Sequence, residues 1–258
     1  MAKRKGTCWM CGAVGPLTEE HAFPDWVRRI FASDGNDIDL SDRREGVTQR
    51  ERMWTNQSGE VTVRTVCRCC NNGWMSALES RCQPFLEGLI LGRRTKLAPG
   101  QLAELATWAV KTAWVFQSQT PLSSTAAAGD RKMLATPPHS IPVNVAVALG
   151  AFREPADRVM CAAWYTAGSS TGESGPIDCS RSTLVVGRVV LVVEQVPDVS
   201  HGGAVAPEWV PLIPTPTTPK AWPPDKILQI HDLEAVAHRG FGAAPWSPFP
   251  EILNPGVD

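Results

Sequence analysis

Two pairs of closely spaced cysteines are the residues of this chain best suited to chemistry. Cys8 and Cys11 are separated by two residues, as are Cys67 and Cys70. Paired thiolates at this spacing can face one ion, and two such pairs supply the four ligands of a closed tetrahedral site. The sequence therefore predicts a structural Zn²⁺ ion. Cys69 competes with Cys70 as the fourth ligand, and we favour Cys70 because its spacing matches that of the first pair.

An acid–histidine pair, Glu20 and His21, lies between the cysteine pairs and is not needed to close the zinc site. The stretches CWMC, EEHAFP and VCRCCN together resemble the HNH endonucleases of the ββα-metal superfamily, in the variant where an asparagine follows the last cysteine. The resemblance covers residues 6–85. It departs from the family at Thr62, which stands where those proteins usually have an asparagine.

The resemblance implies a catalytic centre. His21 would be the general base that activates water, and Glu20 and Asn71 would bind a catalytic Mg²⁺ or Mn²⁺ ion. This chemistry is reasonable, because a neutral imidazole accepts a proton near neutral pH and hard cations prefer oxygen ligands. The chain would then be an enzyme, an endonuclease that hydrolyses phosphodiester bonds in nucleic acid, most readily DNA. Phage defence or a mobile element would be its context.

A second function remains open, that of a zinc-binding module without catalysis that recognises nucleic acid or a protein partner. The presence of Glu20, His21 and Asn71 favours the enzyme. The threonine at position 62 favours the binding module. A homodimer is a further possibility that the sequence leaves open.

The composition is that of an ordinary globular chain. Its 258 residues are 43% hydrophobic and 20% charged, enough for one large domain or two smaller ones. No run of about 18 apolar residues is present, so no membrane span is expected. The first residues also lack a secretory pattern, which predicts a cytoplasmic protein with reduced thiols.

The net charge of −1 conceals an asymmetry along the chain. The first 100 residues carry 15 Lys and Arg against 12 Asp and Glu, and the remaining residues carry 10 against 14. The cysteine-rich part is therefore mildly basic, and its paired arginines could contact phosphates as readily as they could face solvent.

The elements that would position the candidate residues predict an α+β fold. Helical spacing predicts a short helix at 24–31, and alternation predicts a strand at 60–67. A helix follows Asn71, in which we expect Pro84 to introduce a kink or a break and Glu79 to face solvent. The polar segment 33–59 is typical of an insertion loop.

The second half of the chain predicts one long amphipathic helix at 99–120 and a set of strands. The remaining predicted elements are a loop at 121–140, strands at 142–152, 159–167 and 182–196, and a short helix at 231–241. We therefore expect a zinc-stapled ββα-metal (HNH) module over residues 1–95. An accessory α+β domain of unknown role would cover residues 96–258.

Overall fold

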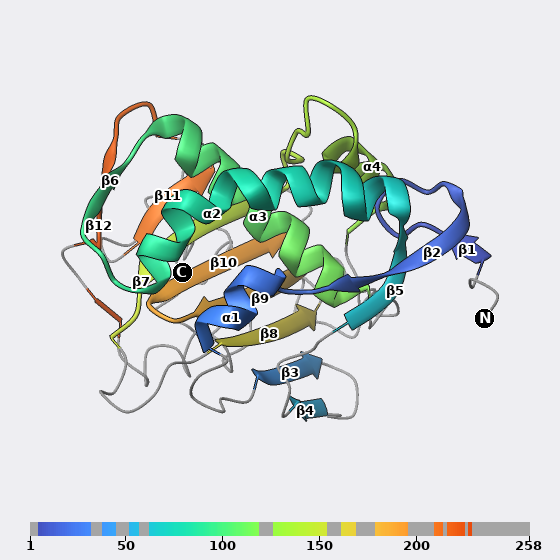
Figure 1. Ribbon diagram of the computed structural model, residues 1–258, viewed down its shortest axis with the longest axis horizontal. Helices are drawn as coiled ribbons and strands as arrows, with labels where there is room; N and C mark the ends of the chain where they lie inside the picture. The colour runs from blue at the N-terminus through green and yellow to red at the C-terminus, as the bar shows by residue number, and fades with distance from the viewer. Residues whose placement is uncertain are drawn as a thin grey trace, which may run out of the picture.

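A computed structural model (Figure 1) describes ten stretches of the chain, which form a mixed helix and sheet fold. The described stretches are residues 5–31, 38–44, 52–56, 62–118, 126–153, 161–168, 179–195, 209–213, 216–224 and 227–228. The predicted α+β class is confirmed. None of the helices in these stretches is long and apolar enough to cross a membrane.

A small antiparallel sheet carries the N-terminal candidate residues. Its strands are β1 (Lys5–Thr7), β2 (Val14–His21) and β5 (Thr62–Cys67), in the order β1-β2-β5. Between β2 and β5 in the chain, α1 (Asp25–Phe31) occupies the position predicted for the first helix. A π-helical turn, η1 (Cys70–Met75), follows β5 and continues into α2 (Ser76–Ile90). Around the cysteines, the paired strands β2 and β5 are thus followed by a helix.

A seven-stranded sheet forms the largest layer, in the order β11-β7-β10-β9-β8-β3-β4. Its strands are β3 (Ile38–Arg44), β4 (Arg52–Asn56), β7 (Val145–Ala151), β8 (Cys161–Gly168), β9 (Cys179–Val186), β10 (Val189–Gln195) and β11 (Trp209–Ile213). Every pairing is antiparallel except that of β3 with β8. A separate pair joins β6 (Thr95–Leu97) to β12 (Lys220–Trp222).

The helix α3 (Pro99–Gln117) joins the two halves of the molecule, because it contacts α2 on one side and strands of the large sheet on the other. Figure 1 shows α2 and α3 over the same face of that sheet. Most residues of α3 are buried, including Trp108 and Trp114. One continuous apolar cluster runs from the cysteines through α3 into the sheet. The packing therefore crosses the boundary expected near residue 95.

Two predicted elements were wrong. Segment 33–59 was predicted to be a loop, yet it contributes β3 and β4. Its polar sequence has a low strand propensity, and the pairing of β3 with β4 and β8 stabilises the strands instead. The predicted loop 121–140 contains α4 (Ala128–Ala135). The break that was one alternative at Pro84 is absent, because α2 continues through this exposed residue, where water can satisfy the carbonyl that proline leaves free. The helix predicted at 231–241 lies outside the described residues.

Candidate metal centre

The four predicted cysteines come together from two loops at the end of the small sheet. Cys8 and Cys11 lie in the turn between β1 and β2, while Cys67 ends β5 and Cys70 begins η1. Their sulfur atoms all lie within 4.8 Å of one another. Cys69 is exposed and outside this group. The choice of Cys70 over Cys69 as the fourth member therefore agrees with the structure.

The sulfur separations match those of a tetrahedral site. Cys8 Sγ lies 3.8 Å from Cys70 Sγ, and Cys11 Sγ lies 3.8 Å from Cys67 Sγ. A tetrahedral ion with Zn–S bonds of about 2.3 Å holds its sulfurs about 3.8 Å apart, whereas a disulfide would bring them to about 2.0 Å. Four cysteines at these distances can hold a metal ion such as zinc.

Local backbone geometry prepares the thiols for this role. Gly12 has a φ of 76°, which lets its N–H reach the carbonyl of Cys8 at 2.9 Å and closes the first turn. The N–H of Cys67 donates to Cys8 Sγ at 3.3 Å. The hydrogen bond with Cys70 lowers the pKa of the Cys8 thiol, while burial opposes the change. One sulfur of the group is therefore ready to bind a cation as a thiolate.

Residues from the second half of the chain support the metal centre. Arg131 donates from Nε to the carbonyl of Trp9 at 2.6 Å, and its guanidinium lies 3.8 Å from the centre of the Trp9 ring. Trp74, within η1, stacks on His139 with 5.2 Å between ring centroids. No feature of the sequence connected Arg131 or His139 to the four clustered cysteines, since both lie more than 60 residues after Cys70, the nearest of the four.

His21 and Glu20 lie on opposite faces of β2, as successive strand residues do. His21 pairs with Thr62 at the start of β5 and is partly exposed, whereas Glu20 pairs with Val63 and is only 5% exposed. Thr62, which replaces the expected asparagine, is thus directly opposite His21. A bulge lies between Thr18 and Glu20. The structure therefore does not bring Glu20 and His21 to one surface.

Asn71 connects the start of the helix to β2. Its Nδ2 donates to the carbonyl of Glu19 at 2.8 Å and to Thr18 Oγ1 at 3.2 Å. Both contacts fall at the bulge, two and three residues before His21. The side chain thus fixes the strand that carries the histidine. In the described residues its Oδ1 accepts no hydrogen bond, so this oxygen is available to a cation.

A buried charge cluster lies on the inner face of β2, formed by Glu20, Glu79 and Lys111. Lys111 is completely buried on α3 and donates to Glu79 Oε1 of α2 at 2.5 Å. Glu79 was expected to face solvent, and this expectation was wrong because α3 crosses α2 at that turn. The sequence contained an indication that Lys111 needs a buried partner, because it is the only charged residue in the stretch ATWAVKTAWVF.

The third member of the cluster, Glu20, keeps its proton to a higher pH than an exposed glutamate does. Burial raises the pKa of its carboxyl from 4.5 to about 7, with Lys111 opposing the rise and Glu79 adding to it. A carboxyl that faces the interior, beside an existing ion pair, is poorly placed to bind an ion shared with Asn71. The catalytic ion expected at Glu20 and Asn71 stays a prediction, and the burial of Glu20 counts against it.

No family model, curated protein or solved structure matches this chain. The resemblance to HNH endonucleases therefore rests on the residues of the chain and on their arrangement alone.

Proposed function

We propose that the small sheet, η1 and α2 form a zinc-stapled HNH-type endonuclease module that cleaves phosphodiester bonds in nucleic acid, most readily DNA. One observation carries the proposal. His21 ends a strand that is paired with β5, and Asn71 at the helix start hydrogen-bonds to that same strand. This is the strand, strand, helix arrangement that the resemblance requires around its base. The four cysteines would hold a purely structural Zn²⁺ ion.

His21 has the exposure that a general base needs. It is partly exposed at the end of β2, beside Thr62, Arg64 and Glu19 on the outer face. Arg64 and Glu19 form an exposed ion pair at 3.2 Å, which can rearrange at little cost when a phosphate approaches. The imidazole would take a proton from the attacking water, while Arg64 would contribute positive charge near the phosphate.

A divalent ion would have Asn71 as its protein ligand, through the amide oxygen. When bound, Mg²⁺ or Mn²⁺ neutralises charge that develops on the phosphate oxygens. Glu20 does not fit this role, because its carboxyl lies on the inner face beside Lys111 and Glu79. The proposal therefore assigns the base to His21 and a ligand to Asn71, and leaves Glu20 out.

Plasmid nicking with His21→Ala tests the proposal. We expect cleavage that requires Mg²⁺ or Mn²⁺ in the wild type, and a loss of about a hundredfold or more in the variant. Zinc content and melting temperature should not change, because His21 is not a ligand of the structural ion and is not part of the hydrophobic core. Val14→Ala is the matched control, since Val14 lies on the same strand and is 83% exposed. A His21→Ala protein that is destabilised but still cleaves at the wild-type rate contradicts the assignment.

The burial of Glu20 favours a second candidate, a zinc-stapled module that binds nucleic acid without cleaving it. In this function Arg64 on the outer face of β5 and Arg68, just after β5, would contact phosphates, since both are exposed. Binding would weaken steeply as salt rises, because each phosphate contact releases counterions. Salt-dependent DNA binding in a gel shift, together with no cleavage under any metal condition, would support this candidate over the nuclease.

A further inference from the structure

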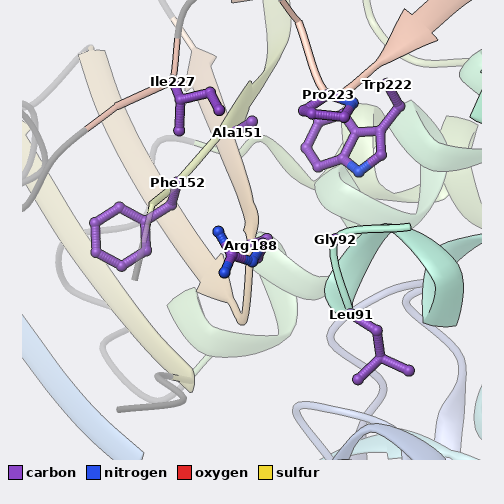
Figure 2. Close-up of a pocket in the computed structure, with 8 residues that line it drawn as sticks. All are labelled: Leu91, Gly92, Ala151, Phe152, Arg188, Trp222, Pro223 and Ile227. Carbon is purple, nitrogen blue, oxygen red and sulfur yellow. The ribbon is translucent and has the colours of Figure 1, made fainter. Parts of the chain in front are cut away.

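A cavity of about 210 Å³ lies at the far end of α2 from the cysteines (Figure 2). Its walls come from the end of α2, the end of β7, the turn between β9 and β10, and the segment that follows β12. Phe152, Leu91 and Ile227 make its sides largely apolar. The volume corresponds to about seven water molecules at liquid density, which suits a small molecule and not a macromolecule.

Backbone hydrogen bonds hold these walls in place. The N–H of Arg188 donates to the carbonyl of Ile90 at 3.1 Å, which fixes the β9–β10 turn against the end of α2. The N–H of Phe152 donates to the carbonyl of Arg188 at 2.8 Å. Trp222 is fixed by the pairing of β12 with β6. The cavity is thus built on regular elements and does not need to form when a ligand arrives.

The side chain of Arg188 lies across Gly92. A Cβ at position 92 would come within 2.5 Å of Arg188 Cδ, so the absence of a side chain there makes room for the arginine. Gly92 also has a φ of 71°, a conformation that favours glycine. The end of α2 therefore has the shape that lets Arg188 reach the cavity.

The guanidinium of Arg188 is not needed to cap α2. The last carbonyls of the helix, those of residues 87–90, already accept backbone N–H groups at 2.8 to 3.1 Å. Within the described part of the chain, no acidic side chain forms an ion pair with Arg188. A charged group that lines a cavity and has no such partner favours an anion there.

Trp222 closes one side of the cavity. Its side chain is 2% exposed, and its Nε1 is buried and makes no hydrogen bond to the described residues. Figure 2 shows the indole nitrogen on the side of the ring that faces Gly92. Because this nitrogen is buried, the indole contributes an apolar wall and not a donor to the cavity. One cationic donor, Arg188, and apolar walls therefore define one ligand chemistry.

We propose that this cavity binds a small organic carboxylate. The carboxylate accepts hydrogen bonds from the Arg188 guanidinium, and an apolar body of about the size of a benzene ring packs against Phe152 and Pro223. This site is separate from His21 and from the cysteines, so it does not depend on the proposed nuclease function.

Calorimetric titration of the zinc-loaded full-length chain with benzoate tests the site. We expect saturable binding of one benzoate per chain. Arg188→Met keeps the apolar stem over Gly92 and removes the charge, so it should weaken binding at least tenfold, the scale of a charge-assisted hydrogen bond. Arg153→Met is the matched control, because Arg153 is exposed next to the cavity but does not line it.

Two ligand controls keep the test valid even if a variant folds poorly. Benzamide, which has the same shape without the charge, should bind the wild type at least tenfold more weakly than benzoate. Inorganic phosphate should also bind more weakly, because it lacks an apolar body. The proposal is overturned if benzoate does not saturate the protein in the millimolar range. It is overturned equally if benzamide or phosphate binds as tightly, or if a folded Arg188→Met variant keeps wild-type affinity.

Discussion

Replacing Glu20 with glutamine should stabilise the protein, and the gain should grow with pH. The carboxyl is 5% exposed, and its pKa is raised from 4.5 to about 7. One pKa unit corresponds to about 1.4 kcal/mol, so ionisable Glu20 costs the folded protein about 3 kcal/mol at pH 8. Glutamine has nearly the same shape and no charge to bury, so Glu20→Gln removes this cost.

The direction of the pH dependence follows from the raised pKa. Above pH 4.5 the unfolded chain releases the Glu20 proton while the folded chain keeps it, so the wild type loses stability as pH rises toward 7. We expect Glu20→Gln to exceed the wild type in free energy of unfolding by about 1.4 kcal/mol at pH 5.5 and by about 3 kcal/mol at pH 8. Both proteins contain the same cysteine site. The pH dependence of that site therefore cancels when the two free energies of unfolding are subtracted.

Urea unfolding at several pH values, with zinc present, measures this difference. Glu19→Gln is the matched control, because Glu19 forms an exposed pair with Arg64 and should change stability by less than about 1 kcal/mol at any pH. A Glu20→Gln protein that is less stable at pH 8, or a difference that does not vary with pH, would refute the reasoning. Repeating the series with Mg²⁺ tests the catalytic ion, because an ion bound at Glu20 would reverse the pH dependence of the wild type.

Three further outcomes are expected. Cys70→Ser should lose bound zinc and most of the cooperative unfolding transition, whereas Cys69→Ser should keep about one zinc per chain by mass spectrometry. Lys111→Met should lower the free energy of unfolding by about 3–5 kcal/mol in urea, since it leaves Glu79 without its partner, and the double replacement with Glu79→Gln should cost less. Gly92→Ala should lower the free energy of unfolding by about 1 kcal/mol or more, because its φ of 71° disfavours a side chain.

Local patterns in the sequence predicted the metal centre and most of the regular elements. The spacing of Cys8 and Cys11, and of Cys67 and Cys70, is a property of two short turns. It therefore predicts the cysteine cluster without any knowledge of how the rest of the chain folds. The helix at 99–117 and the buried strands at 145–151 and 179–195 carry their own periodicity or their own apolar runs.

Features that depend on distant pairing could not be predicted in this way. The polar strand β3 exists because it pairs with β8, more than 100 residues later in the chain. Glu79 forms its ion pair with Lys111 only because α2 and α3 cross at that turn. Glu20 and His21 are neighbours in the sequence, and the alternation of a strand separates them. A resemblance by motif records which residues are present, but not the face on which each one lies.

The cysteine site joins two points of the chain that lie 56 residues apart, at Cys11 and Cys67. A cross-link of this kind makes the geometry at its ends independent of the length of chain between them, because the entropic cost of closing a loop grows only with the logarithm of its length. Doubling the segment would cost about 0.6 kcal/mol more. The stretch between α1 and β5 can therefore change in length at little cost to the cysteine cluster, whereas α1 itself is held in the core through Trp26 and Val27.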